Sequence, residues 1–116
     1  MITDHQDLLE LQAAIYAVLD ELEKRSADFA SARSIIEHAS DRRKQLLARC
    51  TANAPGKAVN ERETFARSSP AYDAGLTELE TNYTAAEKAI SMYFLRQARL
   101  ESLRSILSMQ KSLVGL

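Results

Sequence analysis

The sequence predicts an all-α protein: a long antiparallel two-helix hairpin of coiled-coil type, with a short helical segment at the bend. Three observations support this fold class. Glycine (3) and proline (2) are scarce among the 116 residues, which leaves little turn chemistry for a β-rich fold. Apolar residues recur with a helical period in both halves of the chain. Charges occur in blocks that complement one another when the chain folds back on itself.

The first helix is expected from about residue 4 to about residue 52. In heptads that start at Leu8, eleven of thirteen a and d positions are apolar, which is typical of a coiled-coil seam. The two exceptions, Arg25 and Arg43, are expected to help fix the register of that seam. No proline or glycine precedes Pro55, so no helix-breaking residue interrupts this stretch.

A connector over residues 53–69 separates the two long helices. It begins with Asn-Ala-Pro-Gly at 53–56, where proline removes a backbone donor and glycine permits a left-handed conformation. The charged segment 57–67 follows, and we expect a brief helix there. Ser69 is suited to cap the next helix, with Pro70 at its first position.

The second helix is expected from about residue 70 to about residue 113. From Tyr72 to Val114, steps of four and three residues meet an apolar side chain at ten of thirteen positions, with Arg104 among the exceptions. Leu103 and Phe94 lie beside this stripe and are the alternatives toward its end. Two long helices joined by a short connector favour an antiparallel hairpin. We therefore expect residues 1–116 to form a single helical-hairpin domain.

Charge supports the hairpin independently. Residues 1–32 carry two basic and seven acidic groups, and residues 96–116 carry four basic and one acidic. Residues 33–67 carry eight basic and four acidic groups, and residues 68–95 carry one basic and four acidic. A hairpin therefore places each acidic block beside a basic one.

The apolar stripes are wider than one hairpin can cover, so self-association into a bundle, as a homo-oligomer, is expected. The residues left exposed in a lone hairpin would form that oligomer interface: Leu19, Ile35, Leu47, Phe94 and Leu95.

Several classes of protein are disfavoured. A single cysteine, Cys50, excludes an intramolecular disulfide and a cysteine-based zinc site. No apolar run approaches the ~20 residues of a transmembrane helix, and acidic residues in the first twenty argue against a signal peptide. His38 has Asp41 one turn away but no second ligand pair. We therefore expect a soluble, cytoplasmic protein that has no catalytic residues, metal or cofactor and is not an enzyme.

The most informative polar cluster is basic. Between residues 42 and 67 there are seven basic groups and two acidic ones, and such a concentration creates a local positive potential that can bind phosphates. Phe65 and Tyr72 flank it and can stack on unpaired bases. The candidate nucleic-acid-binding residues are Arg42, Arg43, Lys44, Arg49, Lys57, Arg62, Arg67, Ser69 and Tyr72. The alternative is that these basic side chains form ion pairs within the chain, with Asp41, Glu61, Glu63, Asp73 and Glu78.

Two short stretches carry a resemblance to a known family. Residues 60–72 read NERETFARSSPAY and residues 99–105 read RLESLRS. The chain resembles small helical-hairpin proteins of tailed phages that are similar to the UvsY-like recombination mediators. The resemblance implies a non-enzymatic accessory of DNA recombination or single-strand annealing in the cytoplasm of a bacterial host. It would bind single-stranded DNA or the single-strand binding protein, and help to load a recombinase or annealing protein. Arg62, Arg67, Ser69 and Tyr72 fall in the matching stretch.

Two other functions stay open. The acidic first third of the chain is suited to a phage-encoded inhibitor that binds a protein of a host defence system. The long apolar seams are equally suited to a purely structural coiled-coil adaptor.

Overall fold

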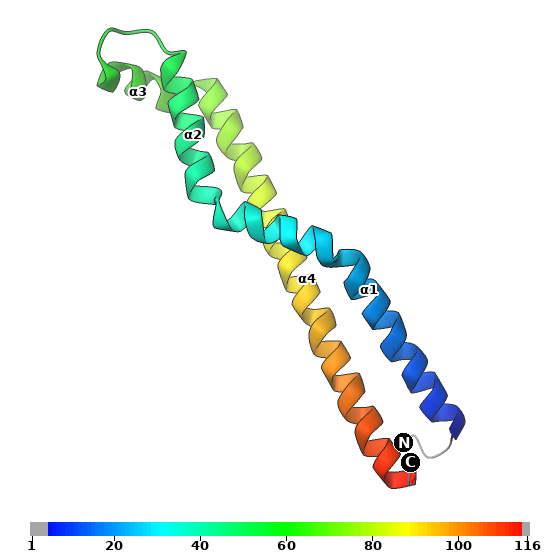
Figure 1. Ribbon diagram of the computed structural model, residues 1–116. Coiled ribbons are helices and arrows are strands. Elements are labelled where there is room, and N and C mark those ends of the chain that lie inside the picture. Colours follow the sequence, from blue (N-terminus) through cyan, green and yellow to red (C-terminus); the bar gives the residue numbers. More distant parts are fainter. Residues whose placement is uncertain (1–4, 115–116) are drawn as a thin grey trace. The chain divides into compact units, whose positions relative to one another are not determined.

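The computed structural model describes residues 5–114, and each element within that range is a helix (Figure 1). The elements are α1 (His5–Glu37), α2 (Ala39–Ala52), α3 (Val59–Arg67) and α4 (Pro70–Val114). The predicted all-α fold class is confirmed for the described residues. They divide into two compact units. The first joins the chain up to Phe29 with the chain from Ala89 onward, and the second comprises Ala30–Lys88.

The predicted continuous helix over residues 4–52 is wrong at one point, because α1 ends at Glu37 and α2 begins at Ala39. His38, between them, has φ −101° and ψ 11°, and this ψ lies well outside the helical range. The His38 N–H still donates to the Ser34 carbonyl at 3.0 Å, and its carbonyl accepts from the Arg42 N–H at 3.0 Å. The helix is therefore interrupted at His38 although no proline or glycine is present there. A search of the sequence for helix-breaking residues does not find such an interruption.

In the first unit, residues 5–29 of α1 pack antiparallel to residues 89–114 of α4. Ile15, Val18 and Leu22 form a buried cluster with Leu100. Further along, the Phe29 ring stacks on Tyr93, with the ring centroids 4.2 Å apart. Residue numbers therefore rise along α1 as they fall along α4, so the two helices are antiparallel here. The charge blocks predict this direction for residues 1–32 beside residues 96–116.

The seam positions differ from the predicted ones near the end of α4. Arg104, which the four-and-three spacing places on the seam, is exposed, and Leu103, the predicted alternative beside the stripe, packs against the core cluster. The cause is the helical period: an α-helix has 3.6 residues per turn, so a strict 3.5-residue repeat drifts around it. Phe94, the other predicted alternative, is 52% exposed. Arg25 and Arg43 are also exposed, so neither is buried in the seam, although Arg43 lines a small hollow with Leu79 and Tyr83 of α4 and so lies at the seam's edge.

In the second unit, α2 packs beside residues 70–88 of α4 at very close range. The side chain of Leu46, itself buried, lies against the backbone of Gly75. A β-carbon added at Gly75 would lie 2.6 Å and 2.8 Å from the two Leu46 methyl carbons and 3.3 Å from Cγ. Glycine in a helix interior normally lowers stability by about 1 kcal/mol relative to alanine, and here it permits the close approach of α2 to α4.

The connector follows the prediction closely. Gly56 adopts φ 127°, a left-handed conformation that side chains disfavour, and α3 is the expected brief helix. The Ser69 Oγ accepts a hydrogen bond from the Tyr72 N–H at 3.3 Å and donates one to the Ala66 carbonyl at 2.7 Å. The predicted cap at Ser69, with Pro70 as the first residue of α4, is therefore confirmed.

We expect Gly75→Ala to lower the free energy of unfolding by about 1–3 kcal/mol, the usual cost of overpacking a core. Both methyls and the branch carbon of Leu46 meet the added carbon, so the Leu46 side chain must leave its present rotamer or α2 must move away from α4. Urea unfolding followed by circular dichroism measures the change. Combination with Leu46→Ala should recover part of the loss, as a favourable coupling energy in a double-mutant cycle. Strict additivity of the two substitutions would contradict the contact.

Candidate nucleic-acid interface

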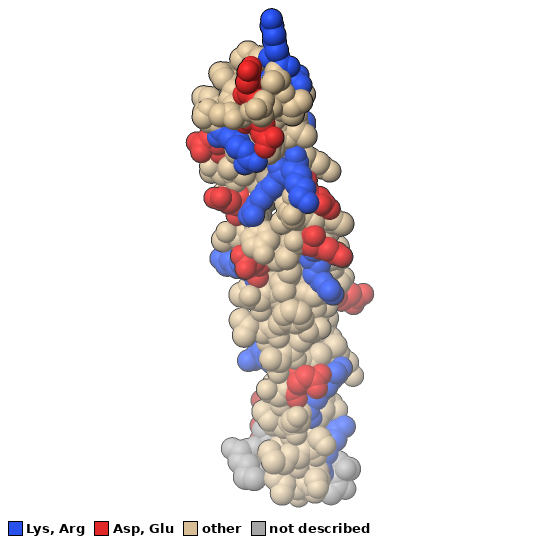
Figure 2. All heavy atoms as spheres, turned by 90° about the vertical axis from the view of Figure 1, so that its left-hand side faces the viewer, with Lys and Arg blue, Asp and Glu red and all other residues tan. Residues whose placement is uncertain are grey.

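The basic side chains of the bend lie on the second unit, mostly on α2. Arg42, Arg43, Lys44 and Arg49 are exposed along that helix, and Lys57 is exposed in the turn that follows it. On the face shown in Figure 2, Lys and Arg side chains gather around the end that carries α3, with Asp and Glu side chains among them. The surface there is mixed in sign, with an excess of positive charge over residues 42–67.

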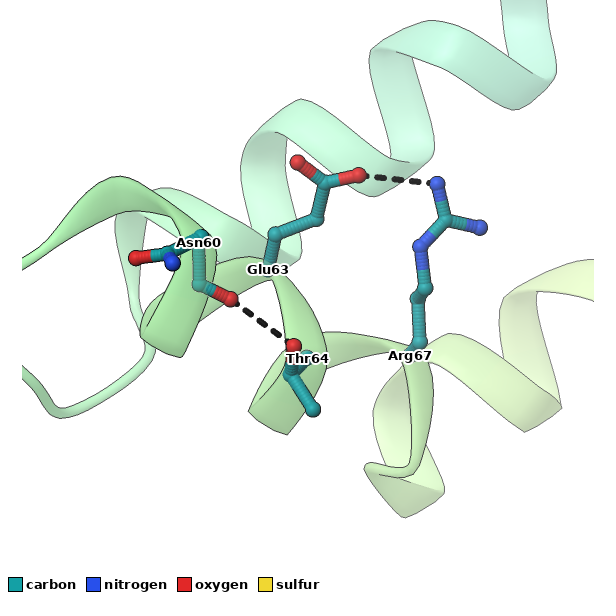
Figure 3. A network of polar contacts seen from close by, with 4 residues as sticks. All are labelled: Asn60, Glu63, Thr64 and Arg67. Atoms are coloured by element: carbon teal, nitrogen blue, oxygen red, sulfur yellow. Dashed lines mark hydrogen bonds and ion pairs between the residues drawn. The ribbon is translucent and has the colours of Figure 1, made fainter.

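Internal pairing of the bend's basic groups is limited to α3. Arg67 donates a hydrogen bond to Glu63 at 2.8 Å, one helical turn away (Figure 3). This hydrogen bond raises the pKa of Arg67 above its ordinary value. Within residues 5–114, the remaining six basic groups of the bend form no ion pair: Arg42, Arg43, Lys44, Arg49, Lys57 and Arg62. Of the five acidic partners that the sequence offered for internal pairing, Glu63 is the one with an ion pair in this range.

Arg62 differs from the other basic residues because it is half-buried. Its Nε atom is buried and has no hydrogen-bond partner among the described residues. Its Cγ lies close to Gly56, where a β-carbon would come within 3.3 Å. The aliphatic part of Arg62 therefore lies where a side chain at position 56 would come into close contact with it.

Two of the candidate residues serve the start of α4. Both hydrogen-bonding functions of the Ser69 hydroxyl are engaged in the cap described above. Tyr72, whose N–H completes that cap, is half-buried. The structure thus brings Ser69 and Tyr72 to the junction of α3 and α4, where they position the helix start.

A hollow of about 490 Å³ opens in the second unit between α2, α3 and the first turns of α4. Phe65 lines it and is 52% exposed. Arg49 and Ser69, both predicted site residues, line it as well. Sequence reasoning missed three others that the fold brings to this hollow, namely Cys50, Asn53 and Glu78. Their spacing carries no signal, because the hollow depends on the close approach of α2 to α4.

The residues expected at an oligomer interface are distributed over both units. In the first unit, Leu19 packs against the core of its own chain, whereas Phe94 and Leu95 are 52% and 65% exposed. In the second unit, Ile35 and Leu47 are half-buried. Phe94 and Leu95 are therefore the two of this set that remain most available for contact with another chain.

The exposed apolar surface of the first unit extends beyond Leu95 along α4. Met92, Ile106, Met109 and Leu113 are all at least 38% exposed. Together with Leu95 they recur at spacings of three, four, seven or eleven residues, which places them on one stripe of the helix.

Comparison of the chain with protein-family models, with curated proteins and with solved structures gives no match. Over residues 5–114, no three side chains of the His, Cys, Asp and Glu types lie together as metal ligands. None of the helices in the described range has a stretch long and apolar enough to cross a bilayer.

Proposed function

We propose that this chain is a non-enzymatic accessory of phage DNA recombination or single-strand annealing, which binds single-stranded DNA with the basic surface around α2. The observation that supports this best is the set of exposed basic side chains that form no ion pair within residues 5–114: Arg42, Arg43, Lys44, Arg49 and Lys57. Unpaired arginines and lysines on one helix and its adjoining turn are free to neutralise phosphates. The resemblance to recombination mediators points to the same activity.

The aromatic and charge content favours a single strand over a duplex as the ligand. A single strand offers unstacked bases, and the exposed ring of Phe65 lines the same hollow as Arg49 of α2. Proteins that bind single strands combine a basic surface with such stacking platforms. The net charge of the whole chain is −1, so binding depends on this local surface and should weaken steeply with salt.

Fluorescence anisotropy of a labelled single-stranded oligonucleotide, titrated at two salt concentrations with duplex as a control, tests this function. Saturable binding to the single strand that weakens as salt rises is the expected result. Absence of binding at low salt would contradict direct DNA binding. It would favour contact with a DNA-bound protein, such as a recombinase, an annealing protein or a single-strand binding protein.

The proposal includes self-association of the hairpin through the exposed apolar stripe of α4. A glutamate placed in this stripe would be desolvated without a partner when two copies meet. We therefore expect Leu95→Glu to shift the mass measured by light scattering from an oligomer to a monomer. The matched control is Gln97→Glu, which adds the same charge to an exposed polar position two residues away. Equal masses for Leu95→Glu and the unmodified chain would contradict this interface.

A protein-directed inhibitor is the second candidate function. Its support is the acidic part of α1, where Glu10 and Glu23 are exposed and can face a basic groove of a host defence protein. A purely structural adaptor would need neither surface. Recovery of one specific partner from host lysate, lost when both glutamates are replaced by glutamine, would support the inhibitor.

A further inference from the structure

The hollow between α2, α3 and α4 has the size of a ligand site. Its volume of about 490 Å³ falls within the range of small-molecule pockets. Its lining includes small residues, among them Gly75 and Ala66, the latter only 1% exposed. Because the Leu46 methyls already fill the space directly above Gly75, a larger residue at position 75 would push into the hollow or displace Leu46.

Phe65 gives the hollow an aromatic wall. Its ring is 52% exposed, although α3 buries Ala66 immediately beside it. A phenylalanine held on a helix at the edge of a hollow presents a flat apolar face, on which any of the four bases can stack. Among the described residues, the ring contacts are all between Phe29, Tyr93 and Phe94 of the first unit. The Phe65 ring therefore stacks on no other aromatic ring of the described chain.

The polar residues of the lining differ in sign. Arg49 is exposed and has no ion pair within the described chain, so its guanidinium can hold a phosphate. Glu78 repels phosphate, but its carboxylate can accept a hydrogen bond from the N–H groups on the edge of a base. The Asn53 amide can both donate and accept. This set fits one nucleotide with its phosphate toward Arg49 and its base among Phe65, Asn53 and Glu78.

We infer that this hollow binds an unpaired nucleobase, stacked on Phe65 and held through its phosphate by Arg49. The inference rests on the proposed function and deepens it, because it assigns the place where a single strand is distinguished from a duplex. The excess of basic groups over residues 42–67 favours an anionic occupant, and the exposed ring of Phe65 in the hollow favours one with a flat base to stack, which an acidic peptide lacks. A paired base, stacked between its neighbours, cannot enter the hollow without leaving the helix.

Cys50 provides a direct probe of occupancy. It is the one cysteine of the sequence, it is half-buried, and it lines the hollow. Oligo(dT) at saturating concentration is expected to slow the reaction of this thiol with a maleimide at least about tenfold. An abasic oligonucleotide of the same length keeps the phosphates and lacks the bases, so it should protect the thiol far less.

Phe65→Ala tests the stacking contact in the full-length chain. Loss of one stacked base typically weakens binding about 5- to 150-fold. We expect a loss in this range for oligo(dT), an unchanged affinity for the abasic strand, and recovery of most of the loss in Phe65→Trp. The matched control is Tyr16→Ala, which removes a 69% exposed aromatic ring from the first unit and should leave both affinities unchanged.

The outcomes separate this inference from the proposed function. Binding of oligo(dT) without protection of Cys50, or with equal affinity in Phe65→Ala, overturns the base-binding hollow and leaves DNA binding intact. Equal affinities of the intact chain for oligo(dT) and the abasic strand would also overturn the base-binding hollow while leaving DNA binding intact. If neither strand binds at low salt, the direct binding of DNA in the proposed function is overturned, and this inference with it.

Discussion

Replacement of Arg42, Arg43 and Lys44 together by alanine is expected to weaken single-strand binding about 100-fold at 0.1 M salt. Each neutralised phosphate of a single strand contributes about 0.7 to the slope of log K against log salt. Loss of three contacts therefore lowers affinity by about two decades at 0.1 M and makes that slope shallower by about 2. Anisotropy titrations at several salt concentrations measure both quantities. The three residues are exposed on α2 and unpaired within the described chain, so the fold should be retained.

The control for this variant changes the net charge by the same amount at another place. Arg25, Arg99 and Lys111 lie in the first unit, and their joint replacement by alanine removes three positive charges there. We expect a loss of less than about fivefold, because these charges lie outside the basic surface of α2 and charges that do not contact the strand are largely screened at 0.1 M salt. Equal losses in the two triple variants would show that net charge, and not the surface of α2, determines binding.

The second large effect is expected in the core of the first unit. Leu22 is 8% exposed and packs in the cluster with Ile15, Val18 and Leu100. Truncation of such a leucine to alanine removes buried apolar area and leaves a cavity, at a cost of about 2–5 kcal/mol. Since single domains are stable by only about 5–15 kcal/mol, Leu22→Ala should markedly lower the urea midpoint followed by circular dichroism at 222 nm.

Leu9→Ala on the same helix is the matched control. Leu9 is 48% exposed, so the same truncation opens no cavity. We expect a change within about 0.5 kcal/mol, as is usual for surface substitutions. Comparable losses in both variants would mean that the buried cluster contributes no more to stability than an exposed leucine, and would contradict the packing of α1 on α4.

The helices were largely predictable because their signals are local. Each of these signals lies within a few residues of the structure that it determines. They are the apolar period that starts at Leu8, the Pro-Gly pair after α2 and the Ser-Pro pair before α4. The bend at His38 was not predictable in this way. His38 is an ordinary helix-compatible residue between two helical stretches, and no proline or glycine near it marks the change to a ψ of 11°.

The candidate interface was predictable in its composition and not in its arrangement. The sequence shows that basic residues concentrate between 42 and 67, but it leaves open whether they pair internally. That question depends on distances of a few ångströms between helices, which periodicity does not specify. The pair that does form, Arg67 with Glu63, has the i, i+4 spacing that can be read within a single helix. Cys50 and Asn53 are neighbours at the end of α2, whereas Glu78 joins them at the hollow only through tertiary packing.

The contact between Gly75 and Leu46 also limits how this sequence can diverge. An added methyl group at position 75 collides with the present position of the Leu46 side chain. A larger residue at position 75 is therefore tolerated best beside a smaller residue at position 46, and the two positions should covary among homologues. Positions 46 and 75 are 29 residues apart in the sequence, so such covariation would mark the pairing of α2 with α4 in sequences whose overall identity is too low to align by eye.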